Sequence, residues 1–211
     1  MEFYEAVGKR RTVREFTDKE IPEEVLVRVL EAGLKAPTGT PIKDIEFVVI
    51  RGKTPLLAVC LEEVRKTADH MLKMIKHSSM DQSQQEVYLQ GIPKQYRMLS
   101  DSGCLLLPFY KQKGELLAPE TQSSLNGFAS VWCCIENILL AAVAEGLACS
   151  IRVPVGEEEN RAAKAVHAPE GYVLPCFIGI GYPADNAEIP PQAKVDIHKK
   201  IHFDKWDNVK R

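Results

Sequence analysis

The sequence lacks a strong excess of charge of either sign. Its 27 lysine and arginine residues nearly balance its 29 aspartate and glutamate residues, which leaves a net charge of −2. A protein that coats nucleic acid needs a surplus of cations to neutralise phosphates. We therefore expect no nucleic-acid partner, and any anion binding has to come from a local cluster of cations.

Long hydrophobic segments are also scarce. No hydrophobic region follows Met1, so we expect no signal peptide and a cytoplasmic location. The longest apolar stretch, residues 128–147, contains Glu136, Asn137 and Glu145. These polar side chains favour a buried amphipathic helix over a membrane span. With 211 residues and 45% hydrophobic content, the chain is long enough to bury one core as a single domain.

The chain has few features of a disulfide or metal site. None of its six cysteines belongs to a Cys-x-x-Cys pair, and most lie in apolar runs, which favours buried free thiols in a reducing compartment. His70 and His77 are spaced to share a helix face, as are His198 and His202, but neither pair has a third ligand in an established pattern. We therefore predict no metal site.

Several catalytic fingerprints are missing as well. The sequence has no Gly-x-x-x-x-Gly-Lys phosphate loop, no Gly-x-Ser-x-Gly elbow and no Gly-x-Gly-x-x-Gly turn. Gly179-Ile180-Gly181 reads as the end of a strand and not as a dinucleotide fingerprint. No side chain qualifies by its spacing as a catalytic acid or base, so the catalytic residues are left unassigned.

What the sequence does contain is a basic cluster near its start: Lys9-Arg10-Arg11-Thr12-Val13-Arg14-Glu15-Phe16. If this segment is extended, Arg10, Thr12 and Arg14 share one face and Val13 turns to the other. Guanidinium groups meet phosphate oxygens two at a time, and a threonine hydroxyl donates to a third, so this face is suited to gripping a dianion. A solvated basic surface is the alternative interpretation.

The rest of the chain alternates between helical and strand patterns. A helix opens at Ile21-Pro22-Glu23-Glu24, ends before the Ala-Pro-Thr-Gly-Thr-Pro break at residues 36–41, and is followed by a strand at 45–50. The other predicted helices are near 54–78, 84–99, 121–146 and 157–166, and the other predicted strands are 104–110, 148–153 and 172–181. No linker divides these elements, so we predict one domain over residues 1–211, with residues 184–211 as a C-terminal arm.

Two N-terminal motifs resemble those of the FMN-dependent nitroreductase-like flavoproteins. The family pattern Arg-Arg-Ser-x-Arg-x-Phe is similar to residues 10–16, and Leu-x-x-Ala-x-x-Ala-Pro-Ser is similar to residues 30–38, each with threonine in place of serine. Three later segments also resemble the family, namely its central helix (137–147), its last core strand (177–183) and its C-terminal arm (194–206). One departure is Pro41-Ile42-Lys43-Asp44-Ile45, where the family usually has Asn-x-Gln-Pro-Trp.

The resemblance implies an α+β fold with a central mixed, mainly antiparallel β-sheet, flanking helices and an extended C-terminal arm. It also implies a homodimer in which the arms embrace the partner and two FMN sites lie in the interface. The implied cofactor contacts are Arg10, Arg11, Thr12, Arg14 and Lys194 at the phosphate and ribityl chain, Pro37, Thr38, Gly39 and Thr40 from the other subunit, and Ser150, Ile151 and Arg152 near the flavin ring.

The same resemblance implies an oxidoreductase that carries reducing equivalents from NAD(P)H through FMN to a nitroaromatic, a quinone or a similar electron-poor acceptor, with ping-pong kinetics. The departure at residues 41–45 keeps two alternatives open. One is an enzyme of the same fold that fragments reduced flavin with oxygen or removes halogen from aromatic rings. The other is a non-catalytic flavin-binding protein.

Overall fold

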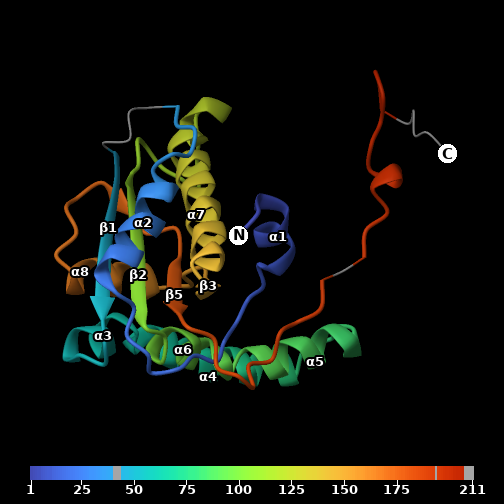
Figure 1. The fold of residues 1–211 in the computed structure, drawn as a ribbon. Helices are drawn as coiled ribbons and strands as arrows, with labels where there is room; N and C mark the ends of the chain where they lie inside the picture. The colour runs from blue at the N-terminus through green and yellow to red at the C-terminus, as the bar shows by residue number, and fades with distance from the viewer. Residues whose placement is uncertain (40–43, 193, 207–211) are drawn as a thin grey trace.

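A computed structural model describes residues 1–39, 44–192 and 194–206, and a five-stranded sheet lies at its centre (Figure 1). Four strands follow one another in the order β1-β2-β5-β3, and β4 pairs with β2 off this path. The strands are β1 Ile45–Arg51, β2 Cys104–Lys111, β3 Ala148–Arg152, β4 Tyr172–Val173 and β5 Phe177–Gly181. The strand pairs are antiparallel, and an isolated bridge between Thr12 and Cys149 is parallel. This confirms the predicted mixed, mainly antiparallel sheet.

Strand β2 divides the core into two layers. Its successive side chains point to opposite faces of the sheet, so Cys104 and Leu106 join one apolar cluster while Leu105, Leu107 and Phe109 join the other. Both faces are covered by helices, and for this reason the strand reads as a continuous apolar run in the sequence.

Two helices, α2 Glu23–Gly33 and α7 Asn126–Ala144, cover the first face of the sheet. They approach most closely at Gly33, where a Cβ atom would lie only 2.6 Å from Cγ1 of Ile138. The segment Gln122–Ala144 is long and apolar enough to cross a membrane by length and composition alone. Its inward side chains, however, belong to the same apolar cluster as α2 and β2.

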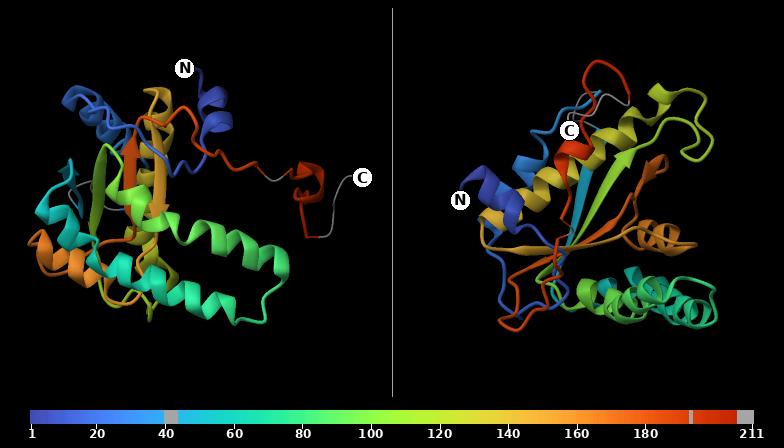
Figure 2. Two further views of the ribbon diagram at one scale, coloured as in Figure 1. Left: turned by 90° about the horizontal axis from the view of Figure 1, so that it is seen from below. Right: turned by 90° about the vertical axis from the view of Figure 1, so that its right-hand side faces the viewer.

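The helices of the second layer are α3 Pro55–Cys60, α4 Glu62–Lys76, α5 Gln82–Gly91, α6 Lys94–Ser100 and α8 Glu158–Ala165. Leu57, Leu99 and Ala162 from three of these helices pack in the cluster that contains Leu105 and Leu107 of β2. The helices α4 and α5 form a hairpin that extends beyond the sheet (Figure 2). Their contacts with each other rest on a small apolar cluster of their own, centred on Ala68, Ile75 and Ile92.

Three of the predicted elements were too long. The helix predicted at 54–78 is divided at Leu61, and the one at 84–99 is divided before Lys94, where Pro93 has no N–H to continue the first helix. The strand predicted at 172–181 is interrupted between β4 and β5 by a segment that contains Pro175.

Helix α1 and the C-terminal arm both lie outside the sheet. Helix α1 Phe3–Lys9 packs beside α7, with Ala6 buried while Phe3 and Tyr4 are exposed. The C-terminal arm leaves the body after β5 and ends far from it, with a short 3-10 helix at Ile197–Lys199 (Figures 1 and 2). Apolar side chains on the arm face solvent, and Trp206 is 80% exposed.

Candidate functional site

The basic segment is extended and follows the outer edge of the sheet. Strand β3 is an edge strand, and Thr12 forms a parallel bridge with its Cys149, whose carbonyl accepts a hydrogen bond from the N–H of Val13 at 3.1 Å. Val13 is only 5% exposed, whereas Arg10, Thr12 and Arg14 are partly exposed. Arg11 and Glu15 are partly exposed as well, so burial separates only Val13 from its neighbours, and the shared face of Arg10, Thr12 and Arg14 stays a prediction.

The first two arginines of the segment have partners within the chain. The Nε atom of Arg10 lies 3.2 Å from a carboxylate oxygen of Glu136 on α7. The guanidinium group of Arg11 turns back and donates hydrogen bonds to the carbonyls of Gly8 and Arg10, at 2.8 and 2.7 Å. Arg11 thus satisfies carbonyls at the end of α1 in this structure, and Arg10 is on the side of α7.

Arg14 differs from these two because one of its donors is buried without a partner. Its Nε atom has no hydrogen-bond acceptor among the described residues. It lines a cavity of about 260 Å³ together with Glu15, Val87, Gln90, Gly91, Lys94, Glu188, Pro190 and Pro191. An unsatisfied buried donor is costly, and donors of this kind in native proteins usually have an acceptor. The Oε2 atom of Glu15, which lines the same cavity, is also buried without a partner, so the residues of this cavity offer one unsatisfied donor and one unsatisfied acceptor.

Lys94 connects the walls of this cavity. Its ammonium group lies 2.9 Å from a carboxylate oxygen of Glu15 on the basic segment and 2.7 Å from one of Glu188 on the root of the arm. The hydrogen bonds to Glu188 and Glu15 raise the pKa of Lys94, and the hydrogen bond from Lys94 lowers the pKa of Glu188. Lys94 and Glu188 are therefore charged at neutral pH. The cavity thus holds two cations, Arg14 and Lys94, and two carboxylates, Glu15 and Glu188, and the Nε atom of Arg14 is a donor that has no hydrogen-bond partner among the described residues.

The loop predicted to line the flavin from the other subunit lies at the opposite end of α7. The N–H of Gly39 donates to Oγ of Ser130 at 3.3 Å, and a Cβ at Gly39 would contact Asn126, the first residue of α7. Pro37 and Thr38 precede it in the same loop, and Thr40 lies outside the described residues. The helix rises about 28 Å over its length. One chain therefore does not bring this loop and the basic segment together, as Figure 1 shows.

The segment Ser150-Ile151-Arg152 has its side chains engaged in the body. Ser150 donates from Oγ to the carbonyl of Met98 at 3.0 Å, and Arg152 forms a buried ion pair with Glu158. Because this segment continues β3 past the bridge at Cys149, it lies beside the chain that leads to Arg14. The backbone of this edge, and not the guanidinium group of Arg152, is the part suited to facing a ligand.

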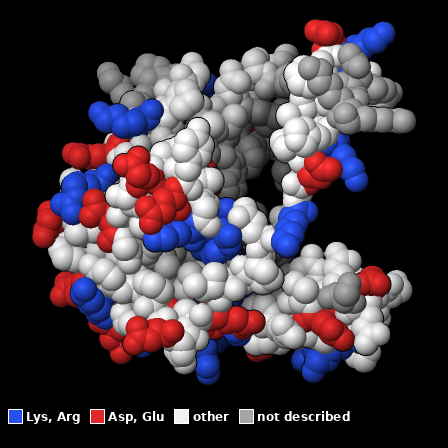
Figure 3. Space-filling view, turned by 45° about the vertical axis from the view of Figure 1, so that its right-hand side comes forward, with Lys and Arg blue, Asp and Glu red and all other residues white. Residues whose placement is uncertain are grey.

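Lys194 is exposed, and the arm to which it belongs runs away from the body after β5 (Figure 1). Figure 3 shows the hollow between the body and the arm, with lysine and arginine side chains at its edge. Of the predicted residues, the structure thus brings together the basic segment and the 150–152 segment. It leaves Lys194 and the loop at 37–39 apart from them.

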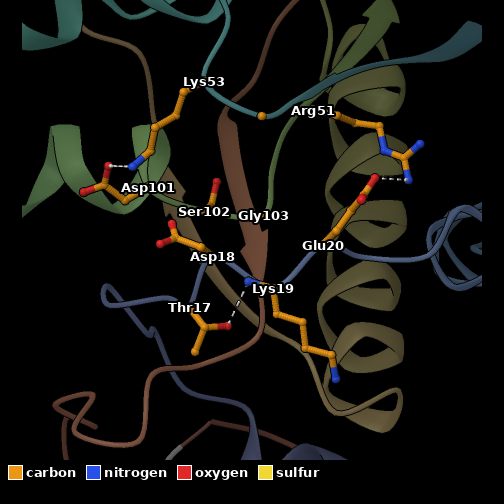
Figure 4. Close-up of a pocket in the computed structure, with 10 residues that line it drawn as sticks. Thr17, Asp18, Lys19, Glu20, Arg51, Lys53, Asp101, Ser102 and Gly103 are labelled. Carbon is orange, nitrogen blue, oxygen red and sulfur yellow. Dashed lines mark hydrogen bonds and ion pairs between the residues drawn. The ribbon is translucent and has the colours of Figure 1, made fainter.

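A second pocket, of about 500 Å³, is less suited to binding an anion (Figure 4). Lys53 lies 3.4 Å from Asp101, and Arg51 lies 3.9 Å from Glu20, so its cations have carboxylate partners. The remaining cation, Lys19, lies over the ring of Tyr182. The pocket beside Arg14 is therefore the stronger candidate.

Sequence reasoning missed the cavity residues Glu15, Gln90, Lys94 and Glu188. Gln90 and Lys94 lie outside the segments on which the sequence resemblance rests, namely residues 10–16, 30–38, 137–147, 177–183 and 194–206. Charge alone does not single out Lys94, because the chain contains many lysines of which most are exposed. A signal was present only at Glu15, which lies inside the motif at residues 10–16.

Known proteins resemble this chain over most of its length. A family model described as the nitroreductase family matches residues 7–182. A protein of Methanothermobacter thermautotrophicus, provisionally named NADH dehydrogenase/NAD(P)H nitroreductase, is 24% identical over 210 residues, which cover 98% of this chain and 88% of that protein. An iodotyrosine deiodinase of Nematostella vectensis is 25% identical over 191 residues, which cover 90% of this chain and 70% of that protein.

Among solved structures, that of an oxidized iodotyrosine deiodinase bound to FMN and 3-iodo-L-tyrosine matches with a TM-score of 0.75. The sequence identity is 21%, and the match covers 97% of this chain and 100% of the other. At this identity the likeness shows that the fold is shared.

Proposed function

Since this chain belongs to the nitroreductase family, we propose that it is an FMN-dependent oxidoreductase that transfers reducing equivalents from NAD(P)H to an electron-poor acceptor such as a nitroaromatic or a quinone. The names of its relatives support this class of reaction, and the bound FMN in a protein of the same fold supports the cofactor. When bound, FMN would supply the redox chemistry, and the protein would supply binding, orientation and electrostatics.

The unpartnered donor of Arg14 is the observation that carries the proposal. FMN offers anionic phosphate oxygens and carbonyl oxygens on its ring, either of which would satisfy the buried Nε atom. If alternation in the extended segment holds, Arg10, Thr12 and Arg14 share one face, and a phosphate and the adjoining ribityl chain could contact all three. The donor set of the segment therefore fits the cofactor.

A complete site requires a second copy of the chain in this proposal. Pro37, Thr38 and Gly39 lie at the start of α7, whereas Thr12 pairs with the strand that follows the end of α7. A homodimer would place the loop of one subunit against the basic segment of the other. It would also place Lys194 of an arm on a partner subunit. Arg11 and the backbone of residues 150–152 complete the proposed contacts.

Exposed apolar side chains support such a dimer. They include Phe3 and Tyr4 on α1 and Val195, Ile197 and Trp206 on the arm. Exposed apolar surface of this extent is typical of an interaction site. Val195, Ile197 and Trp206 are exposed in the described part of the chain, so a partner subunit is the surface that would cover them.

Reductive dehalogenation is the second candidate function. It is favoured because one protein with a similar sequence and one solved structure with a similar fold are both named iodotyrosine deiodinase. The departure from the family pattern at residues 41–45 also sets this chain apart from the usual nitroreductase motif. The same FMN site would serve either reaction, and the acceptor would differ.

The first test is the visible spectrum of the purified protein, with mass spectrometry of any cofactor released by heat. We expect FMN, either as purified or after reconstitution. A protein that stays colourless after incubation with FMN would contradict the proposed function.

The second test separates the two reactions. The flavin-loaded protein is reduced anaerobically with NADH or NADPH and then mixed with a nitroaromatic, a quinone or 3-iodo-L-tyrosine. Rapid reoxidation by the first two supports the leading proposal, and release of iodide from the third supports the alternative. Reduction followed by aerobic loss of the flavin would indicate flavin fragmentation, and failure of NAD(P)H to reduce the flavin would point to a non-catalytic protein.

A further inference from the structure

A buried ion pair joins four elements beside the candidate site. Arg152, at the end of β3, is 5% exposed, and Glu158, at the start of α8, is fully buried. The Nε atom of Arg152 donates to one carboxylate oxygen of Glu158 at 2.9 Å, and Nη2 donates to the other. The backbone N–H of Val155 also donates to the carboxylate of Glu158, at 3.2 Å.

The remaining donors of Arg152 reach the helices of the second layer. Nη2 also donates to Oγ1 of Thr67 on α4 at 3.1 Å, and Nη1 donates to Oε1 of Gln95 on α6. The hydroxyl of Thr67 in turn contacts Glu158. The planar guanidinium fork thus fixes the directions of three side chains at once, which a lysine ammonium group would not do.

This network is linked to both walls of the cavity beside Arg14. Gln95 comes directly after Lys94 in the chain. Lys94 lines the cavity and pairs with Glu15 and Glu188. Arg152 itself belongs to β3, the strand along which the basic segment runs. Arg152 therefore connects the strand that carries one wall to the helix that carries the other.

We propose that Arg152 is a positioning residue that holds α4 and α6 at a fixed distance from the edge of β3 and so sets the width of the cavity beside Arg14. The proposal rests on the proposed function only for its cofactor-affinity readout. If the ion pair between Arg152 and Glu158 had only a structural role, it would stabilise all parts of the body equally. A positioning role requires that the links to Gln95 and Thr67 control the helices α4 to α6 in particular.

The test uses variants that remove one link and leave the buried ion pair intact. Gln95→Leu removes the acceptor for Nη1, and Gln95→Glu keeps an acceptor oxygen in the same place. Thr67→Val removes the hydroxyl, and Thr67→Ser keeps it. Hydrogen exchange is followed by mass spectrometry in peptides from α5 and α6 and, as a reference, in peptides from β1, β2 and α7.

We expect Gln95→Leu and Thr67→Val to raise exchange in α5 and α6 by about tenfold while exchange in the reference peptides stays unchanged. Gln95→Glu and Thr67→Ser should restore the protection of the wild type. Unchanged exchange in α5 and α6, an equal increase in every peptide, or no rescue by the conservative variants would each overturn the proposal.

Cofactor affinity gives an independent readout. We expect the dissociation constant of FMN to rise about tenfold in Gln95→Leu and to return to the wild-type value in Gln95→Glu. An unchanged dissociation constant in Gln95→Leu would contradict a positioning role. A wild-type protein that does not bind FMN would refute the proposed function, but the exchange experiment would still decide the role of Arg152.

Discussion

At the scale of single residues, Arg14 is the side chain on which the proposed cofactor site depends most. Replacing it in Arg14→Met keeps the alkyl stem and removes the buried donor. A hydrogen bond to a charged group contributes about 1.5–3 kcal/mol, so we expect the dissociation constant of FMN to rise roughly 10- to 150-fold. Titration of the apoprotein with FMN, followed by flavin fluorescence, measures this change.

The matched control for this prediction is Lys9→Met. Lys9 lies five residues before Arg14, is exposed, and pairs with Glu5 on its own helix. The substitution removes the same charge from the same part of the surface without touching the cavity. Equal losses of affinity in the two variants would mean that Arg14 acts only through the overall charge of the segment.

The sequence predicts the face of Arg10, Thr12 and Arg14 because alternation in an extended segment is a local property. It does not predict the cavity around Arg14. Lys94 pairs with Glu15 and Glu188, and these three residues are far apart in the chain. Arg152 illustrates the same limit. The resemblance places its segment near the flavin, but only the fold shows that Glu158, Thr67 and Gln95 surround its guanidinium group.

At the scale of elements, the contact between α2 and α7 makes a sharp prediction at Gly33. A methyl group there would lie 2.6 Å from Cγ1 and 2.9 Å from Cδ1 of Ile138, so Gly33→Ala forces the two helices apart. We expect a loss of about 1–3 kcal/mol in the free energy of unfolding. For a chain of this size, each kcal/mol corresponds to a fall in Tm of about 2–4 °C.

Gly8→Ala is the control, because a Cβ at Gly8 would meet no atom within 4 Å. Gly8 lies in α1, where alanine is a better helix former, so we expect a gain of up to about 1 kcal/mol. Thermal unfolding followed by circular dichroism, at one protein concentration, compares the two variants. A Gly33→Ala variant as stable as Gly8→Ala would contradict the close packing of α2 on α7.

The sequence predicts most helices and strands, but it predicts less well where they are interrupted. Pro93 and Pro175 divide two predicted elements, and these prolines were visible in the sequence but lie inside otherwise regular patterns. The requirement for glycine in the Gly179-Ile180-Gly181 strand follows only from the packing of the folded chain. A Cβ at Gly179 would lie 2.3 Å from the carbonyl oxygen of Met98, so α6 packs directly on the backbone of β5.

At the scale of the whole molecule, the main question is how the two halves of the proposed site meet. The sequence patterns identify the basic segment and the loop at residues 37–39, but neither pattern predicts the distance between them. In the structure the loop lies at the start of α7, Thr12 bridges the strand that follows the end of α7, and the arm runs away from the body. Association of two chains is the step that would complete the site, so oligomeric state and cofactor binding should change together.

Cys133 provides a probe of this association. It is exposed on the outer face of α7, between the exposed residues Ala129 and Glu136. The other cysteines are buried, and burial raises their thiol pKa values, to about 11 for Cys60 and Cys134 and to about 12 for Cys104 and Cys176. A thiol-specific reagent near neutral pH should therefore modify Cys133 first.

If the outer face of α7 packs on a second copy, Cys133 is covered in the dimer and exposed in the monomer. The variant Ala129→Arg places a charge one helical turn from Cys133, where solvent accepts it in a monomer but a buried interface does not. We expect the wild type to have the mass of a dimer by light scattering and to react at Cys133 at least about tenfold more slowly than Ala129→Arg with N-ethylmaleimide. Ala129→Arg should also bind FMN more weakly, although its own residues 10–14 are intact. Equal reaction rates in two proteins of monomeric mass would contradict a shared site, and the cofactor would then have to bind to the basic segment of one chain alone.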